Sequence, residues 1–179
     1  MYRDPETWRV LMEKLAKAMT AYLRAQIHSG VDAVQVFDSW IGCLSPQDYR
    51  EYALPYSKRI FQGLEGTGVP RIHFGTGTSN LLEGMKEAGG DVFSVDWRIP
   101  IDQAWQRLGH DVAIQGNLDP TALLADTSLL KSKANDILTR TRGTPGHIFN
   151  LGHGILPQTP VQNAIELVRF VHSFKGSAS

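Results

Sequence analysis

The sequence predicts an α/β fold, in which a parallel sheet is covered by helices. A first helix is followed by five short apolar segments that alternate with helical segments. Short and uniformly apolar strands are typical of a parallel sheet. Polar residues follow each strand directly, as Asp38-Ser39, Gly75-Thr76, Asp96-Trp97, Gly116-Asn117 and Gly152-His153. Five strands suit a doubly wound sheet, but an open sheet uses mainly its switch point, whereas a (β/α)8 barrel gathers every strand end around one mouth. The polar residues therefore favour the barrel.

The first half of the chain begins with a helix that starts at Asp4-Pro5-Glu6 and extends to about Gly30. Asp4 is the predicted N-cap and Pro5 the first helical residue, and apolar residues recur behind them at helical spacing. A strand is expected at residues 33–37. Ser45-Pro46 begins the next helix, which extends to about Leu64 and should be interrupted or kinked at Pro55.

The second half repeats a strand and a helix four times. Strands are expected at residues 71–75, 92–95, 112–115 and 147–150, and helices at residues 81–88, 101–108, 126–142 and 161–174. Gly89-Gly90 closes the helix at residues 81–88. Residues 1–175 therefore form a single domain, and residues 176–179, Gly-Ser-Ala-Ser, are expected to be a frayed tail.

Composition excludes several classes of function. Lys plus Arg and Asp plus Glu both number 18, so no electrostatic footprint for nucleic acid or an anionic membrane exists. No apolar run approaches the ~18 residues that span a bilayer, and the N-terminal residues do not form a signal peptide. Cys43 is the one cysteine, which excludes a disulfide framework and a thiolate zinc cluster. A reducing compartment, most simply the cytoplasm, is expected.

The most informative motif is Phe149-Asn150-Leu151-Gly152-His153-Gly154, in which a strand ends at a histidine between two glycines. Glycine on both sides removes the Cβ barrier to unusual backbone angles. An imidazole at a strand end can pair with a carboxylate or move a proton near neutral pH. The structural alternative is a histidine that is hydrogen-bonded to backbone at a tight turn.

Five segments of this sequence resemble uroporphyrinogen decarboxylase, in the same order and at similar spacing. They are Val36-Phe37-Asp38-Ser39-Trp40, Ala53-Leu54-Pro55-Tyr56, Val95-Asp96-Trp97, the segment Ile114 to Pro120, and Asn150-Leu151-Gly152-His153-Gly154-Ile155. The resemblance covers essentially the whole chain and the C-terminal half of the family. It implies the last five of eight strand–helix units of a (β/α)8 barrel, which works without metal or organic cofactor and is a homodimer at full length.

The activity that the resemblance implies is that of a carboxy-lyase in heme biosynthesis, which converts uroporphyrinogen to coproporphyrinogen by removing carbon dioxide from four acetate side chains. The half of the family that this sequence does not match carries an arginine-rich segment, an aspartate for the pyrrole N–H groups and a tyrosine of the cleft. The chain is therefore expected to be a truncated product or to need a complementing piece, and to have little or no turnover alone.

The resemblance also assigns roles to residues. It places His153 in the cleft as a catalytic and substrate-binding residue, and Phe37 and Ser39 as substrate-binding residues. A pyrrole face can pack against Phe37, and Ser39 can donate to a carboxylate, although a turn or helix cap is the alternative for Ser39. Because strand side chains alternate, Asp38 should point away from both and act as a structural acceptor.

Three further motifs are expected to be mainly structural. Asp96 should orient a loop or pair with an arginine, with Trp97 packing at the rim and Arg98 at the surface. Residues 115–120 should form a strand end, a turn and a helix start, in which Asn117 satisfies backbone groups and Asp119 is a cap. The glycine-rich segment at residues 75–80 lacks a P-loop lysine, so only a weak anion site is conceivable.

Two alternatives to a decarboxylase remain open. The first is a corrinoid-dependent methyltransferase of the same superfamily, which binds zinc through a His-x-Cys pair and another cysteine. Here the pair is His73-Phe74-Gly75, so a zinc site, which needs three or four protein ligands, is disfavoured. The second is a barrel remnant that binds or assembles without catalysis.

Overall fold

A computed structural model of the chain describes residues 1–175, and the predicted frayed tail at residues 176–179 lies outside the described residues. The helices are α1 (Pro5–His28), α2 (Pro46–Tyr52), α3 (Leu54–Gly63), α4 (Leu82–Ala88), α5 (Ile101–Leu108), α6 (Thr127–Thr141) and α7 (Val161–Ser173). The strands are β1 (Val34–Phe37), β2 (Arg71–Phe74), β3 (Val92–Ser94), β4 (Ala113–Leu118) and β5 (His147–Leu151). Two short 3-10 helices, η1 (Ile41–Cys43) and η2 (Pro120–Leu124), follow β1 and β4.

Helices α1, α2 and α6 begin where a side chain accepts from one of their first backbone N–H groups. Asp4 accepts from Thr7 N at 3.0 Å, Ser45 accepts from Asp48 N at 3.1 Å, and Asp126 accepts from Leu129 N at 2.9 Å. Pro55 lies in the first turn of α3, so the predicted interruption is a break between two helices. The break falls at Ala53, which α2 and α3 share as a cap.

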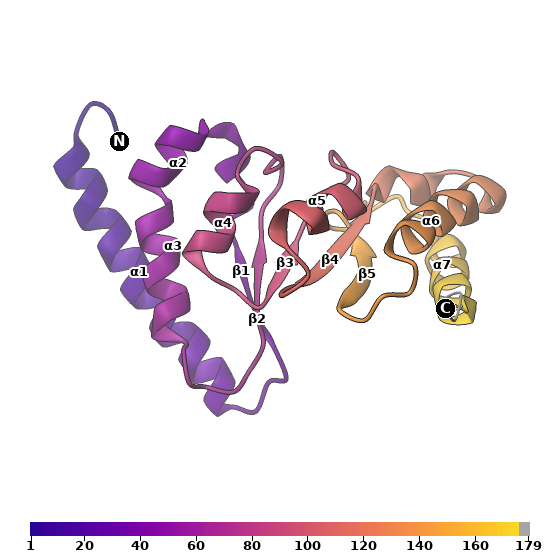
Figure 1. Cartoon of the computed structure of the whole chain (residues 1–179), viewed down its shortest axis with the longest axis horizontal. Coiled ribbons are helices and arrows are strands. Elements are labelled where there is room, and N and C mark those ends of the chain that lie inside the picture. The colour runs from indigo at the N-terminus through magenta and orange to yellow at the C-terminus, as the bar shows by residue number, and fades with distance from the viewer. Residues whose placement is uncertain (176–179) are drawn as a thin grey trace.

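The five strands form one parallel sheet in the order β1-β2-β3-β4-β5. Consecutive strands are always neighbours, and each helix from α3 to α7 packs against the helix that follows or precedes it. In Figure 1 the helices follow one another around the sheet from α1 at the left to α7 at the right. This arrangement is that of consecutive units of a (β/α)8 barrel and has no switch point, which confirms the predicted fold class.

The alternation of strand side chains divides the sheet into a helix-covered face and an inner face. The covered face holds most of the core, including Leu82, Met85, Phe93, Ile114 and Leu130, all at most 1% exposed. A smaller cluster joins α1 and α3 to Val34. No described helix covers the inner face, where Phe37 is 68% and Ile148 44% exposed.

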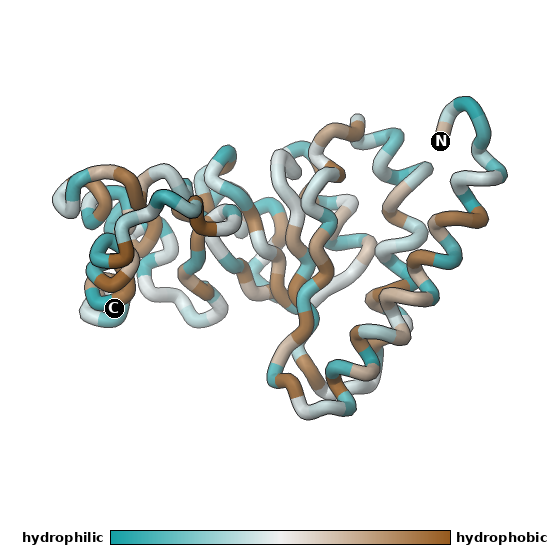
Figure 2. Tube along the Cα trace, turned by 180° about the vertical axis from the view of Figure 1, so that it is seen from behind, coloured by the Kyte–Doolittle hydropathy of each residue, from teal (hydrophilic) through white to brown (hydrophobic). Residues whose placement is uncertain are grey.

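The two helices at the ends of the sheet carry apolar side chains that no described residue covers. On α1 these recur along one side as Leu11, Leu15, Met19 and Tyr22, and on α7 as Val161, Ile165 and Val168, all 40% exposed or more. Figure 2 shows the recurring hydrophobic segments along α1. No described helix is both long and apolar enough to cross a bilayer.

One predicted element is wrong in its extent. The strand is predicted to end at residue 115 and to be followed by a turn at Gly116-Asn117, but β4 continues to Leu118. The extra residues pair with β5, as Gly116 with Phe149, Asn117 with Asn150 and Leu118 with Leu151. The pairing with residues 33 positions later in the chain supports an extended conformation that the local Gly-Asn signal does not indicate.

Neighbouring leucines on α6 provide a test of this packing. Leu130 is 0% exposed and Leu129 is 46% exposed. We expect Leu130→Ala to lower the free energy of unfolding by about 3 kcal/mol, because it leaves a cavity in the core. Leu129→Ala, the matched control, should cost less than about 1 kcal/mol. Urea denaturation followed by circular dichroism measures both, and equal costs would contradict the described orientation of α6.

His147 provides a test of pH dependence. Its imidazole lies half-buried between Thr141 Oγ1 at 3.0 Å and the Gly116 carbonyl at 3.1 Å. Burial lowers the pKa of His147 from its ordinary value of 6.5, and the hydrogen bond to Gly116 offsets this in part. The unfolded chain therefore takes up the proton first, and the contribution of His147 to stability, full above pH 6.5, is lost as the pH falls through its lower native pKa.

We therefore expect the free energy of unfolding to fall less steeply on acidification below about pH 6.5 in His147→Gln than in the wild type. Urea midpoints of both proteins, measured between about pH 7.5 and pH 5, isolate the effect of His147. Parallel profiles for the two proteins would show that this histidine has no lowered pKa.

Candidate active site

The inner face of the sheet is hollowed at the carboxyl ends of the strands. A cleft of about 430 Å³ lies there. Its lining comes from every strand or the loop after it: Gln35, Phe37, Ser39, Phe74, Ser94, Gln115, Asn150, Leu151, His153, Gly154 and Ile155. The structure thus brings together the three residues that the sequence analysis selected, Phe37, Ser39 and His153, from opposite ends of the sheet.

Aromatic rings cross the cleft in a row. Phe37 and Phe74 pair in register and meet edge to face, with ring centroids 5.7 Å apart. The Phe74 ring in turn lies 6.3 Å from the His153 imidazole. These contacts are of the distance and tilt that favour aromatic pairs. Phe37 is 68% and Phe74 6% exposed, so the apolar surface that the row offers a ligand is mainly that of Phe37.

Polar side chains occupy the middle of the same face. Gln115 Nε2 donates to Ser94 Oγ at 3.0 Å and lies 3.5 Å from Gln35 Oε1. Gln35, Phe74 and Ser94 are not among the site residues predicted from the sequence. Strand alternation is the signal that could have found them. Gln35 lies two residues before Phe37 and so on the same face, and Phe74 and then Ser94 follow Phe37 across the sheet in register.

The cleft has little charge of its own. None of the described residues that line it is Lys, Arg, Asp or Glu, and His153 is its one readily titratable side chain. His153 is exposed to solvent. An anionic ligand would therefore meet hydroxyl, amide and imidazole donors here, but no permanent cation.

Asp38 points away from the cleft, as strand alternation predicts. Its Oδ2 accepts from Ser57 Oγ at 2.7 Å and lies 3.1 Å from His73 Nε2. The prediction that Asp38 is a structural acceptor is confirmed by these contacts. Ser39, on the cleft side, has its carbonyl bound by the Thr76 hydroxyl.

His73 faces the helices and is 0% exposed. Its Nδ1 lies 3.1 Å from the Gly89 carbonyl, so both ring nitrogens have partners within the protein. His73 and His153 are thus on different faces of the sheet and cannot share a ligand. Within residues 1–175 no group of three His, Cys, Asp or Glu side chains is arranged to hold a metal ion.

The buried carboxylate of Asp96 ties two loops together. It is 2% exposed and accepts from Gly77 N at 2.6 Å, from Arg98 N at 3.0 Å and from the Arg98 guanidinium. Arg98 also stacks on Trp97, with 4.4 Å between guanidinium carbon and ring centroid. The Asp96 carboxylate accepts a hydrogen bond from Gly77 N, so the glycine-rich loop at residues 75–80 is held by a carboxylate of the protein itself.

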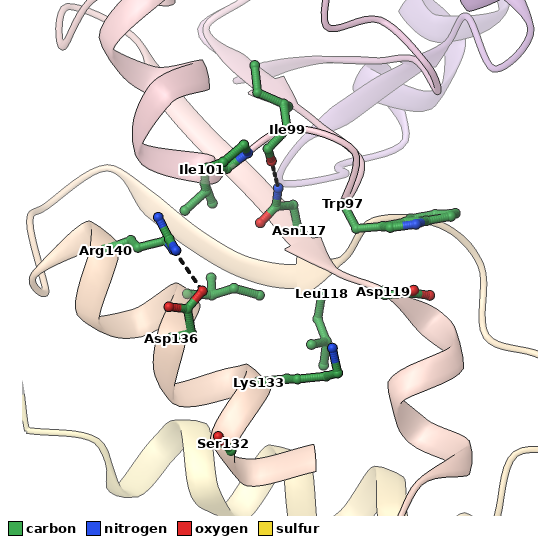
Figure 3. A pocket seen from close by; sticks show the side chains of 12 residues that line it. Trp97, Ile99, Ile101, Asn117, Leu118, Asp119, Ser132, Lys133, Asp136 and Arg140 are labelled. Atoms are coloured by element: carbon green, nitrogen blue, oxygen red, sulfur yellow. Dashed lines mark hydrogen bonds and ion pairs between the residues drawn. The ribbon is translucent and has the colours of Figure 1, made fainter. Parts of the chain in front are cut away.

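A second cavity, of about 550 Å³, lies between the loop before α5 and helix α6, away from the cleft (Figure 3). Asn117 at its inner end donates to the carbonyls of Asp96 and Ile99 at 2.9 and 2.7 Å, as its predicted role requires. Asp119 caps η2 by accepting from Thr121 N at 2.9 Å. The charged Arg140 at the opposite wall is paired with Asp136 and Asp102.

The two glycines around His153 differ in their roles. A Cβ on Gly152 would lie 2.8 Å from Trp97 N and 3.0 Å from Asp96 Cα, both backbone atoms. A Cβ on Gly154 would meet nothing within 4 Å. Neither glycine has a positive φ, so neither is needed for a left-handed backbone conformation. Gly152 is required because the β5 loop passes directly against the loop that Asp96 holds.

A family model described as "Uroporphyrinogen decarboxylase (URO-D)" matches residues 1–174. The uroporphyrinogen decarboxylases of Carboxydothermus hydrogenoformans and Koribacter versatilis are 52% and 51% identical, over 96% and 97% of this chain and 49% and 50% of their own lengths. The chain thus spans about half the length of the curated relatives it matches.

A solved structure described as a methyltransferase from Methanosarcina mazei has a similar fold. It superimposes with a TM-score of 0.77 at 21% identity, over 89% of this chain and 47% of that chain. At this identity the likeness concerns the fold alone.

The two glycines beside His153 allow a matched test. We expect Gly152→Ala to lower the free energy of unfolding by about 2 kcal/mol, because the added methyl group meets backbone that cannot move without disturbing Asp96. Gly154→Ala should change it by less than about 0.5 kcal/mol. Denaturation curves measure both, and a Gly152 variant as stable as the Gly154 variant would contradict the close approach.

Proposed function

The chain belongs to the uroporphyrinogen decarboxylase family, and on this basis we propose that it forms part of a (β/α)8 barrel that converts uroporphyrinogen to coproporphyrinogen. The observation that carries the proposal is the cleft, in which the residues after β1 and β5 meet across one concave face. The proposed activity is that of a carboxy-lyase in heme biosynthesis.

We propose that the barrel is completed by the part of the family that this chain does not match. The relatives are about twice as long as the matched segment. In the described residues β1 and β5 each have one neighbour in the sheet, and the adjoining helices α1 and α7 carry uncovered apolar side chains. Three more strand–helix units would pair with both strands and cover both helices.

The substrate class fits the composition of the cleft. A tetrapyrrole presents flat apolar rings, for which Phe37 offers an exposed aromatic ring, with the nearly buried Phe74 beside it. Its acetate carboxylates need donors, which the Ser39 hydroxyl can supply. The further positive charge that a polyanion requires is proposed to come from the arginine-rich segment of the completing part, because no cationic side chain of this chain lines the cleft.

The proposed reaction replaces each carboxylate by a proton. A proton is added to the pyrrole carbon beside the one that carries the acetate arm, which gives a cationic ring. The bond between the arm and its carboxyl carbon then breaks, carbon dioxide departs, and the electron pair neutralises the ring. Loss of the ring proton and protonation of the arm leave a methyl group. The ring is its own electron sink, so the protein has to position the arm, exclude water and handle protons.

His153 is proposed to serve this proton traffic and to bind the substrate. It stands at the end of the aromatic row, where a pyrrole packed on Phe74 would bring an acetate arm within its reach. An imidazole can donate a proton or pair with a carboxylate near neutral pH. Phe37 and Ser39 face it from the other wall.

The resemblance further supports a homodimer at full length and residence in the cytoplasm, without metal or organic cofactor. Each of these belongs to the proposal. The alternative of a corrinoid-dependent methyltransferase gains no support from His73, which is buried on the other face of the sheet. The alternative of a barrel remnant without catalysis is distinguished by the experiment below.

The proposal is tested by supplying the missing part. The chain is produced alone and together with the N-terminal half of the Carboxydothermus hydrogenoformans relative, and coproporphyrin is measured after oxidation of the products. We expect no turnover from either part and turnover from the complex. His153→Ala should lower kcat/KM of the complex by about 100-fold, and Ser39→Ala by about tenfold.

His28→Ala is the matched control, because His28 is an exposed histidine at the far end of α1 from the cleft. It should leave kcat/KM within about twofold. A stable complex without decarboxylation, or a His153 variant as active as the His28 variant, would overturn the proposal. Formation of a complex without decarboxylation, with binding of uroporphyrinogen retained, would favour the remnant.

A further inference from the structure

Behind the cleft, three polar side chains meet, of which His73 and Ser57 are buried and Asp38 is 23% exposed. His73 on β2 lies between the Gly89 carbonyl, 3.1 Å from Nδ1, and the Asp38 carboxylate, 3.1 Å from Nε2. The same carboxylate oxygen accepts from Ser57 on α3 at 2.7 Å. The remaining surroundings of the imidazole are the rings of Phe61 and Phe93, 4.7 and 6.1 Å away between centroids.

The partners of the ring determine its protons. A neutral imidazole has one donor and one acceptor nitrogen, whereas a carbonyl and a carboxylate both accept. If the ring were neutral, one of its two nitrogens would therefore direct a lone pair at the lone pair of an oxygen. An imidazolium donates at both nitrogens and leaves no buried polar atom without a partner.

Few other charges act on this pair. Arg71, on the same face of β2, is already bound to Asp91, with which it makes three hydrogen bonds. Tyr49 on α2 is neutral, because burial and, to a smaller extent, the Asp38 carboxylate raise its pKa. Asp38 is thus the carboxylate that faces His73, and its 3.1 Å separation from Nε2 is one that an ion pair with a doubly protonated ring would have.

The pair is joined to the cleft through the backbone. Asp38 lies between Phe37 and Ser39, whose side chains line the cleft on the other side of the strand. The Ser39 carbonyl accepts from Thr76, and a Cβ on Gly42 would collide with the Thr76 carbonyl. The segment after β1 is therefore fixed to the segment after β2 on one side by Thr76 and on the other by the Asp38–His73 pair.

We propose that His73 is a doubly protonated imidazolium at neutral pH, and that its ion pair with Asp38 is the positioning element that sets Ser39 and Phe37 in the cleft. The second clause rests on the proposed function, whereas the first concerns the chain alone. His73 and Asp38 act here through Ser39 and have no contact with substrate.

The second histidine of the sheet gives an internal control. His147 is half-buried and also has partners at both nitrogens, but one of them is the Thr141 hydroxyl, whose single proton can go to His147 Nδ1 or to the carbonyls of Ile137 and Leu138. When that proton goes to Nδ1, a neutral His147 satisfies both contacts, which a carbonyl and a carboxylate do not allow at His73. The two histidines should differ in the number of ring protons at the same pH in the same sample.

The first experiment is solid-state NMR of the sedimented chain labelled with ¹⁵N histidine at pH 7, which works whatever the oligomeric state. Signals are assigned by His73→Gln and His147→Gln. We expect protons on both nitrogens of His73 and on one nitrogen of His147. A single protonated nitrogen on His73 would overturn the proposal, even if the complex described above is fully active.

The second experiment measures positioning in the complex with the completing half. Asp38→Asn keeps the shape of the side chain and removes its charge. We expect one ring proton fewer on His73 and a loss of about tenfold in kcat/KM, mostly through KM, because the residues displaced bind substrate. His73→Gln should have a similar kinetic effect, which covers the case in which the Asp38 variant does not fold.

Thr141→Val is the control, because it alters the site of the other histidine of the sheet and leaves Asp38 untouched. It should change kcat/KM by less than about twofold and leave the His73 signals in place. Unchanged KM in folded Asp38→Asn and His73→Gln complexes would overturn the positioning role. Absence of turnover in the unsubstituted complex, with the expected His73 signals, would instead refute the proposed function alone.

Discussion

The constraint on which this structure depends is the two-residue repeat of a β-strand. In all five strands one set of side chains faces the helices and forms the core, and the other set faces away from them. Helix packing fixes the first set, so the second set has no freedom of register. Phe37, Phe74, Ser94 and Gln115 lie side by side on the inner face because His73, Phe93 and Ile114 lie side by side in the core. The cleft is thus a consequence of how the opposite face is packed.

The loops at the strand ends follow a second rule, which is that buried polar groups need partners. Asp96 and Asn117 are both almost fully buried, and each binds groups from loops other than its own strand. Asp38 does the same behind Ser39. These three side chains replace water at the backbone of neighbouring loops, and they hold the rim of the cleft without lining it. Gly152 then fits against the rim because it has no side chain.

The sequence was sufficient to predict what local patterns determine. Neighbouring residues along the chain determine these features: the caps Asp4 and Ser45, the helix break before Pro55, the order of strands and helices, and the direction of Asp38. The end of β4 could not be predicted, because its last residues are extended only through their pairing with β5.

The same distinction applies to the site. His153, Ser39 and Phe37 lie in the sequence motifs at residues 36–40 and 149–154, and these motifs predicted them as site residues. Phe74 and Ser94 stand in no motif and join the cleft through register alone. The hydrogen bond from Gly77 N to the Asp96 carboxylate joins residues 19 positions apart, and no local sequence pattern predicts it.

The order in which the helices pack has a wider meaning. Each unit of strand and helix contacts chiefly the units before and after it in the chain, as in a stack of repeats. Stability in such an array is close to a sum of units and of the junctions between neighbours. Such a molecule has no single element on which its stability depends. A change in the packing of α1 can affect α7 only through the units that lie between them. The chain is therefore expected to tolerate a change within one unit when the junctions of that unit with its neighbours keep their packing.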